Sequence, residues 1–323
     1  MMDQGKTLTA PAVQRVRIDE HDAGQRIDNF LMRVCKGAPK SLIYRILRSG
    51  EVRANGGRIS QTYRLQQGDE IRIPPLRLAE PKDSSRVPAR EFPILFEDDA
   101  MLAIDKPAGV AVHGGSGVSF GVIEQLRRQR PEAKFLELAH RLDRETSGIL
   151  LIGKKRSALN VLHDQLRERE LDKRYYALVA GRWMNPVQHI RLALRKYLTE
   201  GGERRVVVDA DEGKPAHSIV RLVRRWERFS LLEVQIKTGR THQIRVHLTH
   251  LGFPLAGDDK YGDFALNKAL QKEGLKRMFL HAAHLQLPHP LTAENLDLVC
   301  DLPPELASFV EHLNRSERCD YEQ

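Results

Sequence analysis

The region from residue 93 to residue 315 contains a succession of short apolar runs with few helical segments between them. Strand-like runs occupy residues 94–96, 101–104, 175–179, 219–223, 231–236 and 279–287. Amphipathic helical patterns occur over residues 118–129 and 156–169, and the second places Leu159, Leu162 and Leu166 on one side. Strands that follow one another without helical crossovers tend to pair as antiparallel neighbours. We therefore predict an α+β fold with a mixed, largely antiparallel sheet.

One carboxylate stands just before a strongly apolar run. Asp143 lies between Arg141 and Arg144, and the small, turn-forming residues 146–148 follow it. The run 148–152 has the pattern of a buried strand. A tight turn before such a strand would hold Asp143 at the lip of the sheet, where it can meet a substrate. The flanking guanidinium groups would keep the carboxylate ionised and are suited to holding phosphates.

The first part of the chain predicts a smaller compact unit, residues 15–78. One helix opens over residues 24–31, and a second begins near Ser41, which we expect to cap it, and ends at Gly50. A strand, an Asn-Gly turn and another strand follow over residues 52–59. Basic residues gather in this unit at Lys40, Arg45, Arg48, Arg53 and Arg58.

Charge favours a polyanionic partner. The chain has a formal net charge of +9, and residues 15–86 hold fifteen Lys and Arg against nine Asp and Glu, a net of +6. No apolar run approaches the roughly 20 residues of a membrane span, and residues 1–11 lack the apolar core of a secretory signal. Three widely separated cysteines suggest neither a disulfide framework nor a metal site. We expect a cytoplasmic protein with no membrane or metal partner, and a monomer.

These patterns divide the chain into five parts. We expect a disordered tail over residues 1–14, the compact basic unit over 15–78, a linker over 79–92, the large α+β unit over 93–315 and a C-terminal tail over 316–323. Residues 241–251 predict a helix capped by Thr241, with Ile244, Leu248 and Leu251 inward. A weak helical pattern also occurs over residues 268–276.

Four strings resemble the RluA-type RNA pseudouridine synthases. They are DKPAGVAVH at residues 105–113, HRLDRETSGILL at 140–151, KRYYALVAG at 173–181 and TGRTHQIRVHL at 238–248, and GDDKYG at 257–262 follows the same family. Residues 15–78 resemble the S4 RNA-binding domain through GQRIDNFL, SLIYRILRSGEVRAN and LQQGDEIRI. The resemblance implies the pseudouridine synthase fold, with a small N-terminal S4 (αL-like) domain ahead of it.

The resemblance also implies an activity and its residues. It implies isomerisation of uridines in 23S (large-subunit) ribosomal RNA, with base flipping and without a cofactor. Asp143 would be the catalytic carboxylate, Tyr175 the active-site tyrosine and Arg245 the arginine that pairs with Asp143. Arg141 would replace the flipped uridine, and Tyr176 should point to the opposite strand face. Substrate-binding roles are expected for His140, Arg141, Arg144 and Arg240, and S4-type RNA contacts for Lys40, Arg45, Arg48, Arg53 and Arg58.

Other functions are compatible with the same motifs. The chemistry is equally suited to transfer RNA or another RNA, because the motif residues do not distinguish these substrates. A non-catalytic S4-type ribosome-assembly factor is a different class, but it would not need Asp143. A metal-assisted hydrolase would need clustered carboxylate ligands, which the sequence does not offer.

Overall fold

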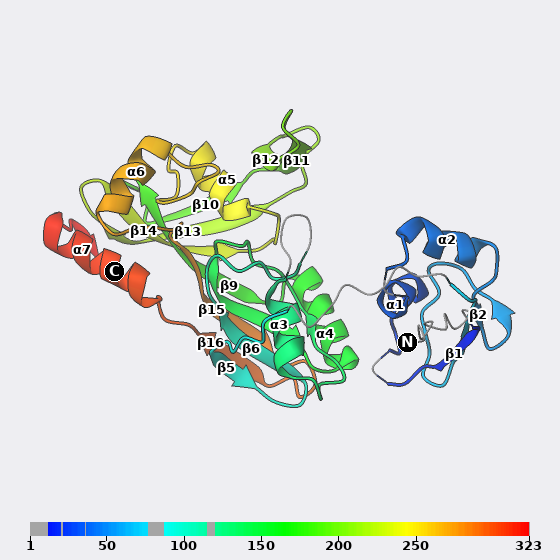
Figure 1. Cartoon of the computed structure of the whole chain (residues 1–323). Coiled ribbons are helices and arrows are strands. Elements are labelled where there is room, and N and C mark those ends of the chain that lie inside the picture. The colour runs from blue at the N-terminus through cyan, green and yellow to red at the C-terminus, as the bar shows by residue number, and fades with distance from the viewer. Residues whose placement is uncertain (1–11, 21, 36, 77–86, 115–119, 323) are drawn as a thin grey trace, which may run out of the picture. The chain divides into compact units, whose positions relative to one another are not determined.

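The computed structural model describes residues 12–20, 22–35, 37–76, 87–114 and 120–322. The chain forms two compact units, which divide near Pro88 and are described separately below. Figure 1 labels the helices and strands of both units. No helix in the described ranges is both long enough and apolar enough to cross a membrane.

The N-terminal unit packs two helices on a small antiparallel sheet. Helix α1 spans Ile27–Val34 and α2 spans Lys40–Arg48. The strands β1 (Gln14–Arg17), β2 (Arg53–Ala54), β3 (Gly57–Arg58) and β4 (Glu70–Ile73) pair in the order β1-β4-β2-β3. Phe30, Ile43, Ile46, Val52 and Ile71 are buried together between helices and sheet. The unit therefore has a hydrophobic core of its own.

Two details of this unit differ from the sequence prediction. Strand β1 begins at Gln14, which we had assigned to the tail, because its backbone pairs with β4 although its side chains are mostly exposed. Helix α2 is capped by Pro39, whose extended backbone precedes the helix, so Ser41 lies inside the first turn. The predicted tail up to residue 11 and linker residues 79–86 lie outside the described residues.

The C-terminal unit is built on an eleven-stranded sheet. Its central order is β10-β13-β14-β9-β15-β8-β6-β5, with β16 on β15, β17 on β13 and β7 on β8. It contains β5 (Ile94–Glu97), β6 (Met101–Lys106), β7 (Glu137–Leu138), β8 (Ser147–Gly153), β9 (Asp172–Ala180), β10 (Val187–Arg191), β13 (His217–Arg225), β14 (Phe229–Ile236), β15 (Leu280–Pro288), β16 (Asn295–Val299) and β17 (Tyr321–Glu322). Among pairings of described residues, β8 with β15 is the single parallel one. The predicted mixed, largely antiparallel α+β fold is therefore confirmed.

Helices cover the sheet at two places (Figure 1). Helix α3 spans Val122–Gln129, and α4, Arg156–Glu168, packs Leu159 and Leu162 against β6, β8 and β15 as predicted. Helices α6 (Phe264–Lys272) and α7 (Pro304–Ser316) pack against β9 and β14 through a cluster that includes Leu270 and Phe309. Helix α5, Gln243–His250, contributes Ile244 and Leu248 to the central core.

Two further segments differ from the sequence prediction. The predicted C-terminal tail, residues 316–323, includes β17, which pairs with β13 and so belongs to the sheet. Helix α6 begins four residues before the weak pattern at 268–276, because the Asp263 side chain caps it by accepting the Leu266 N–H at 2.9 Å.

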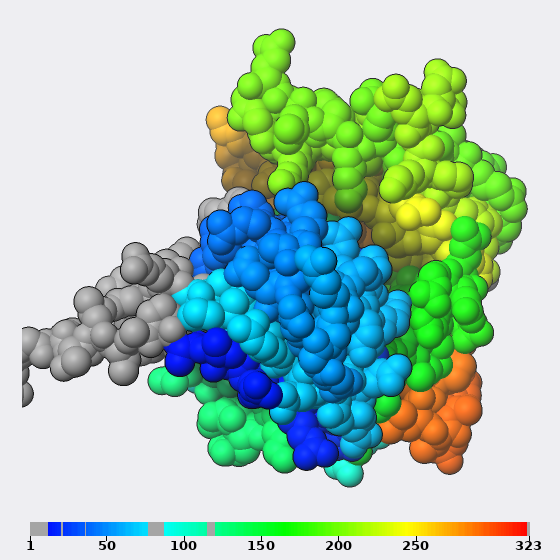
Figure 2. All heavy atoms as spheres, turned by 90° about the vertical axis from the view of Figure 1, so that its right-hand side faces the viewer, coloured from blue at the N-terminus to red at the C-terminus, as the bar shows by residue number. Residues whose placement is uncertain are grey.

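One hairpin stands out from the C-terminal unit. Strands β11 (Leu194–Leu198) and β12 (Arg204–Val208) form a two-stranded sheet of their own, and the hairpin projects from the body in both views (Figures 1 and 2).

Candidate active site

The turn that carries Asp143 is held by the buried strand that follows it. Every residue of β8 is buried, between β6 and β15. Gly148 has φ +104°, and a Cβ placed there would lie 2.2 Å from the carbonyl oxygen of Ala282 on β15. The Thr146 N–H donates to the Asp143 carbonyl at 3.1 Å and closes the turn. A glycine is required here because only it combines this φ with so close a strand contact.

A buried lysine supports the same turn. The Lys106 ammonium donates to the carbonyls of Pro107 and Val110 at 2.8 Å and of Arg144 at 3.1 Å. Burial lowers the pKa of Lys106 to about 7. The Gly109 N–H also donates to the Arg144 carbonyl, at 2.9 Å. The backbone after Asp143 is therefore fixed to the loop of the first family-like string.

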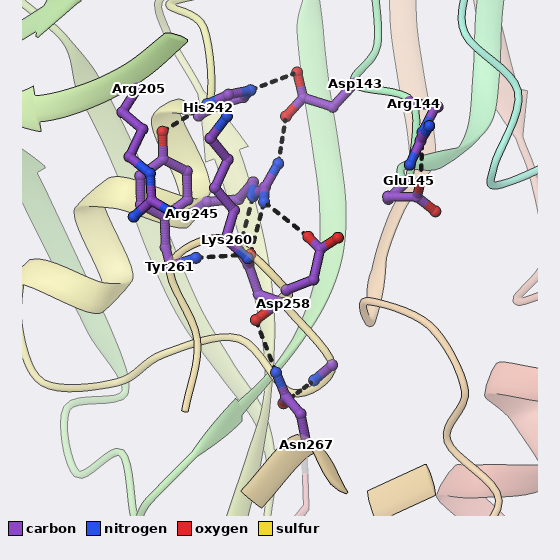
Figure 3. A network of polar contacts seen from close by, with 12 residues as sticks. Asp143, Arg144, Glu145, Arg205, His242, Arg245, Asp258, Lys260, Tyr261 and Asn267 are labelled. Carbon is purple, nitrogen blue, oxygen red and sulfur yellow. Dashed lines mark hydrogen bonds and ion pairs between the residues drawn. The ribbon is translucent and has the colours of Figure 1, made fainter. Parts of the chain in front are cut away.

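Asp143 faces a pocket of about 540 Å³. The pocket is lined by Arg141, Leu142, Asp143, Thr146, Tyr175, Ile236, Gly239, Arg240, Thr241, His242, Gln243, Ile244, Arg245 and Leu280. The side chains of Arg245 and His242 point at this carboxylate (Figure 3). Arg245 Nη1 lies 3.6 Å from Oδ2, and His242 Nε2 lies 3.9 Å from Oδ1. These contacts are longer than hydrogen bonds, so the carboxylate keeps its oxygens for a substrate.

Arg245 is held mainly by a second carboxylate. Its Nε and Nη2 donate to Asp258 at 2.7 and 2.6 Å, and Asp258 is fully buried. Asp258 Oδ1 also accepts the N–H groups of Lys260 and Tyr261. Burial alone would raise the pKa of Asp258, but the Arg245 hydrogen bonds and charge lower it below its ordinary value. This bidentate pair fixes the guanidinium with its remaining nitrogen toward Asp143.

His242 and Tyr261 complete the network around Asp143 (Figure 3). The Tyr261 oxygen accepts the Val206 N–H at 2.9 Å and lies 2.7 Å from His242 Nδ1. The phenol can donate its proton to Nδ1, and a neutral ring bonded in this way carries its N–H on Nε2, toward Asp143. Burial lowers the pKa of His242 to about 4, so the ring is neutral near pH 7.

His242, Asp258 and Tyr261 also belong to the site, although we do not predict them from the sequence. All three lie in family-like strings, at residues 238–248 and 257–262, but nothing in the order of the residues says that these strings meet. His242 has φ +53° and is the N-cap of α5. Thr241 therefore precedes the cap, contrary to our prediction, and the left-handed turn at His242 aims its ring into the pocket.

Tyr175 lies on β9 with its side chain buried in the pocket wall beside Ile236 and Leu280. Tyr176 packs in the cluster on the other side of the sheet, as strand alternation predicts. Burial, with a contribution from the Asp143 charge, raises the pKa of Tyr175, so its hydroxyl stays protonated.

The remaining predicted residues lie at the rim or behind the turn. Arg141 and Arg240 are exposed and line the pocket. Arg144 does not support Asp143 as expected, because its Nε donates to Glu145 at 2.7 Å. His140 Nε2 accepts the Leu151 N–H at 3.1 Å, and burial lowers its pKa to about 4. His140 thus anchors the turn to β8.

The basic residues of the N-terminal unit are exposed. Lys40, Arg45 and Arg48 lie on α2 and Arg53 and Arg58 on the hairpin of β2 and β3. Across the described residues of both units, no three His, Cys, Asp or Glu side chains are grouped so that they could hold a metal ion.

Comparison with known proteins identifies the family. A family model described as RNA pseudouridylate synthase matches residues 100–250. A Haemophilus influenzae protein, ribosomal large subunit pseudouridine synthase C, is 48% identical over 322 residues, which cover 98% of this chain and 100% of that protein. This chain belongs to the RNA pseudouridylate synthase family. The Escherichia coli protein of the same name is 49% identical over 319 residues, covering 96% of this chain and 99% of that one.

Solved structures agree with this assignment. The structure of human RNA pseudouridylate synthase domain containing 4 superposes with a TM-score of 0.59 and 25% identity, covering 72% of this chain and 95% of that chain. The structure of human RNA pseudouridylate synthase domain containing 1 superposes with the same TM-score and the same identity, covering 76% of this chain and 94% of that chain. The protein is therefore an RNA pseudouridine synthase, an enzyme that isomerises uridine in RNA, and the predicted pseudouridine synthase fold is confirmed.

Proposed function

We propose that this enzyme isomerises uridines of 23S (large-subunit) ribosomal RNA, with Asp143 as the catalytic carboxylate. The observation that carries the proposal is the pocket in which Asp143 faces Arg245 and His242. The proposed substrate is supported by the activity for which relatives about half identical over nearly the whole chain are named, ribosomal large subunit pseudouridine synthase C. Ribosomal RNA as substrate places the reaction in the cytoplasm. We also propose that the enzyme acts as a monomer.

The reaction exchanges one bond of the base for another. The bond from C1′ to N1 breaks, the uracil turns in the pocket, and a bond from C1′ to C5 forms. C5 loses a proton and N1 gains one, so the conversion is redox-neutral and needs no cofactor. An ionised Asp143 can attack C1′, add to C6 of the base, or remove a sugar proton through a glycal route. These three routes use the same carboxylate.

Arg245 keeps Asp143 ionised when the base closes the pocket to water. An unpaired carboxylate in a desolvated pocket would instead take up a proton. The buried Tyr175 offers a ring on which the detached uracil can stack and a hydroxyl for proton transfer. His242 directs a neutral N–H at Asp143 and steadies it through the Tyr261 contact.

Arg141 is the residue that we assign to base flipping. It is exposed at the pocket mouth, two residues before Asp143, and a planar guanidinium can stack and hydrogen-bond in place of an extruded base. Arg240 at the rim is suited to an RNA phosphate, and Arg144 and His140 act through the turn that they border.

The N-terminal unit is proposed to be an S4-type RNA-binding domain. Its two helices, short strands and exposed Lys40, Arg45, Arg48, Arg53 and Arg58 support this assignment. Exposed arginines on one helix and the adjoining hairpin suit contacts to RNA phosphates and shape rather than to a base sequence.

Tritium release tests the proposed reaction and its catalytic residue. Ribosomal RNA of the large subunit is transcribed with uridine tritiated at C5, since every route must give up that hydrogen. We expect release by the wild type and none by Asp143→Asn or Asp143→Ala, because neither side chain can act as nucleophile or base. Circular dichroism and RNA binding serve as controls for folding. An active Asp143→Asn variant would refute the role of Asp143, and release from transfer RNA alone would refute the substrate.

A further inference from the structure

A second hollow opens beside the active-site pocket. It has a volume of about 1000 Å³ and shares Arg141, Tyr175, Ile236, Gly239 and Arg240 with the pocket wall. Its other lining residues are His140, Leu166, Arg167, Arg169, Lys173, Lys237 and Thr238. We call this hollow the basic groove. Because the two hollows share five lining residues, they adjoin one another.

Every formally charged residue that lines the basic groove is positive. Six of its twelve lining residues are Lys or Arg, and none is Asp or Glu: Arg141, Arg167, Arg169, Lys173, Lys237 and Arg240. The cations come from four segments: the turn before β8, the end of α4 with the residue after it, the start of β9 and the loop after β14. Arg167 also pairs with Asp164 at 2.7 Å, so its charge is partly compensated. A polyanion is the ligand that such a lining favours.

A third hollow, which Asp143 itself lines, has a different charge balance. It is lined by four cationic residues, Arg141, Arg144, Arg245 and Lys260, and by four carboxylates, Asp143, Glu145, Glu203 and Asp259, together with His242. Its charges therefore cancel, whereas those of the basic groove add. A phosphate backbone is therefore attracted to the basic groove more than to this hollow.

The positive field extends past the basic groove toward β10 and β13. Burial lowers the pKa of His217 on β13, and the charges of Arg191, Lys237 and Arg169 lower it further. Arg191 lies on the edge strand β10 and is exposed. Cations thus continue beyond the groove along the same end of the sheet, which suits a ligand longer than one nucleotide.

We infer that the basic groove binds the phosphate backbone of the RNA strand on one flank of the target uridine. The strand enters the active-site pocket from this groove, and Arg169, Lys173 and Lys237 contact its phosphates. This inference rests on the proposed function and adds a direction to it: the basic groove holds the RNA strand on one flank of the target uridine.

A paired set of variants tests the inference. Arg169→Gln with Lys237→Gln removes two cations from the groove, and Lys272→Gln with Arg315→Gln removes two exposed cations from α6 and α7. We expect the groove variant alone to raise KM while kcat stays within about twofold, since ground-state and transition-state binding are lost together. Its RNA affinity should also depend less on salt, by about one unit of slope per cation removed. Unfolding midpoints check that both variants fold.

Shortened RNAs test the direction. A single-stranded oligonucleotide containing the target uridine is prepared with both flanks, without the 5′ flank and without the 3′ flank. The difference in affinity between wild type and groove variant should disappear when one flank is removed and persist when the other is removed. A groove variant that binds like the control variant, or a difference that survives removal of either flank, would overturn the inference. Binding is measured without turnover, so a failure of the proposed reaction would be seen separately, as inactive wild type.

Discussion

At the scale of single residues, the proposed catalytic carboxylate, Asp143, faces an arginine that is itself held by another carboxylate. Arg245 is 4% exposed and donates two hydrogen bonds to the fully buried Asp258, while only its third nitrogen points at Asp143. Asp258 therefore positions Arg245, and Arg245 sets the electrostatic surroundings of Asp143. The same guanidinium lies 5.0 Å from the centre of the Tyr261 ring, which also orients His242.

Arg245 has two roles: it balances the charge of the buried Asp258, and it places a positive charge beside Asp143. A double variant separates them. Arg245→Gln leaves Asp258 as an unpaired buried charge, so we expect a loss of about 3–5 kcal/mol in stability together with loss of activity. Adding Asp258→Asn removes that charge and should recover most of the stability but not the activity, because Asp143 still lacks its counter-charge. Urea unfolding and tritium release measure the two effects. Recovery of turnover in the double variant would show that Arg245 acts only through folding.

At the scale of elements, the site is built on the turn before β8. The parallel contact of β8 with β15 brings Gly148 against the Ala282 carbonyl, and Lys106 at the end of β6 binds the carbonyl of Arg144. Three strands that are distant in sequence thus fix one turn. The Asp143 side chain is partly buried, and the backbone of its turn is anchored to the core.

Two glycines of this region allow a matched test of strand packing. Gly148 and Gly109 both have positive φ, but a Cβ at Gly148 meets Ala282 at 2.2 Å, whereas one at Gly109 meets nothing within 4 Å. We expect Gly148→Ala to cost about 2–5 kcal/mol in unfolding free energy, from backbone strain plus overpacking. Gly109→Ala should cost about 1 kcal/mol, from strain alone. Equal losses in urea unfolding would mean that the β15 contact does not constrain the turn.

At the scale of the whole molecule, each unit has its own core, and several histidines are buried in the larger one. The N-terminal unit has a separate apolar cluster around Phe30 and Ile46. In the catalytic unit, burial lowers the pKa values of His140 and His242 to about 4, and also lowers those of His247 and His281. These buried groups tie the stability of that unit to pH.

Stability should decrease as the pH falls. The unfolded chain binds a proton at each of these histidines near the ordinary pKa of 6.5, whereas His140 and His242 in the folded chain do so only near 4. Between these values the unfolded state holds more protons, so the unfolding free energy falls with decreasing pH. Urea unfolding at pH about 7, 6 and 5 should show a shallower fall for His242→Gln than for His163→Gln, an exposed control on α4. Identical pH profiles would contradict a neutral His242.

Because each unit has its own hydrophobic core, we predict that the catalytic unit is active without the N-terminal unit. Removing residues 1–88 takes away the exposed basic side chains of α2 and the β2–β3 hairpin but leaves every residue lining the pocket. We expect weaker RNA binding with a smaller dependence on salt, and turnover that persists at high RNA concentration. Unchanged affinity at several salt concentrations would refute the S4 assignment of the N-terminal unit.

Local sequence determined the elements and much of the chemistry of this protein. The alternation of Tyr175 and Tyr176, the apolar side of α4 and the strands of the sheet follow from periodicity, because burial on one face imposes a repeat that the residues display. Asp143, Arg245 and Tyr175 were predicted because they lie in strings that resemble one family, and the structure brings them to one pocket.

Only the tertiary structure decided which residues meet. Asp258 and Tyr261 lie 115 or more positions after Asp143, and no local pattern indicates that they hold Arg245 and His242. The strands β1 and β17 have no clear alternation and exist because a neighbouring strand supplies hydrogen bonds. Pairing of charges across the fold depends on distance in space, which the order of residues does not contain. For that reason Arg144, next to Asp143 in sequence, pairs with Glu145, while the distant Arg245 faces Asp143.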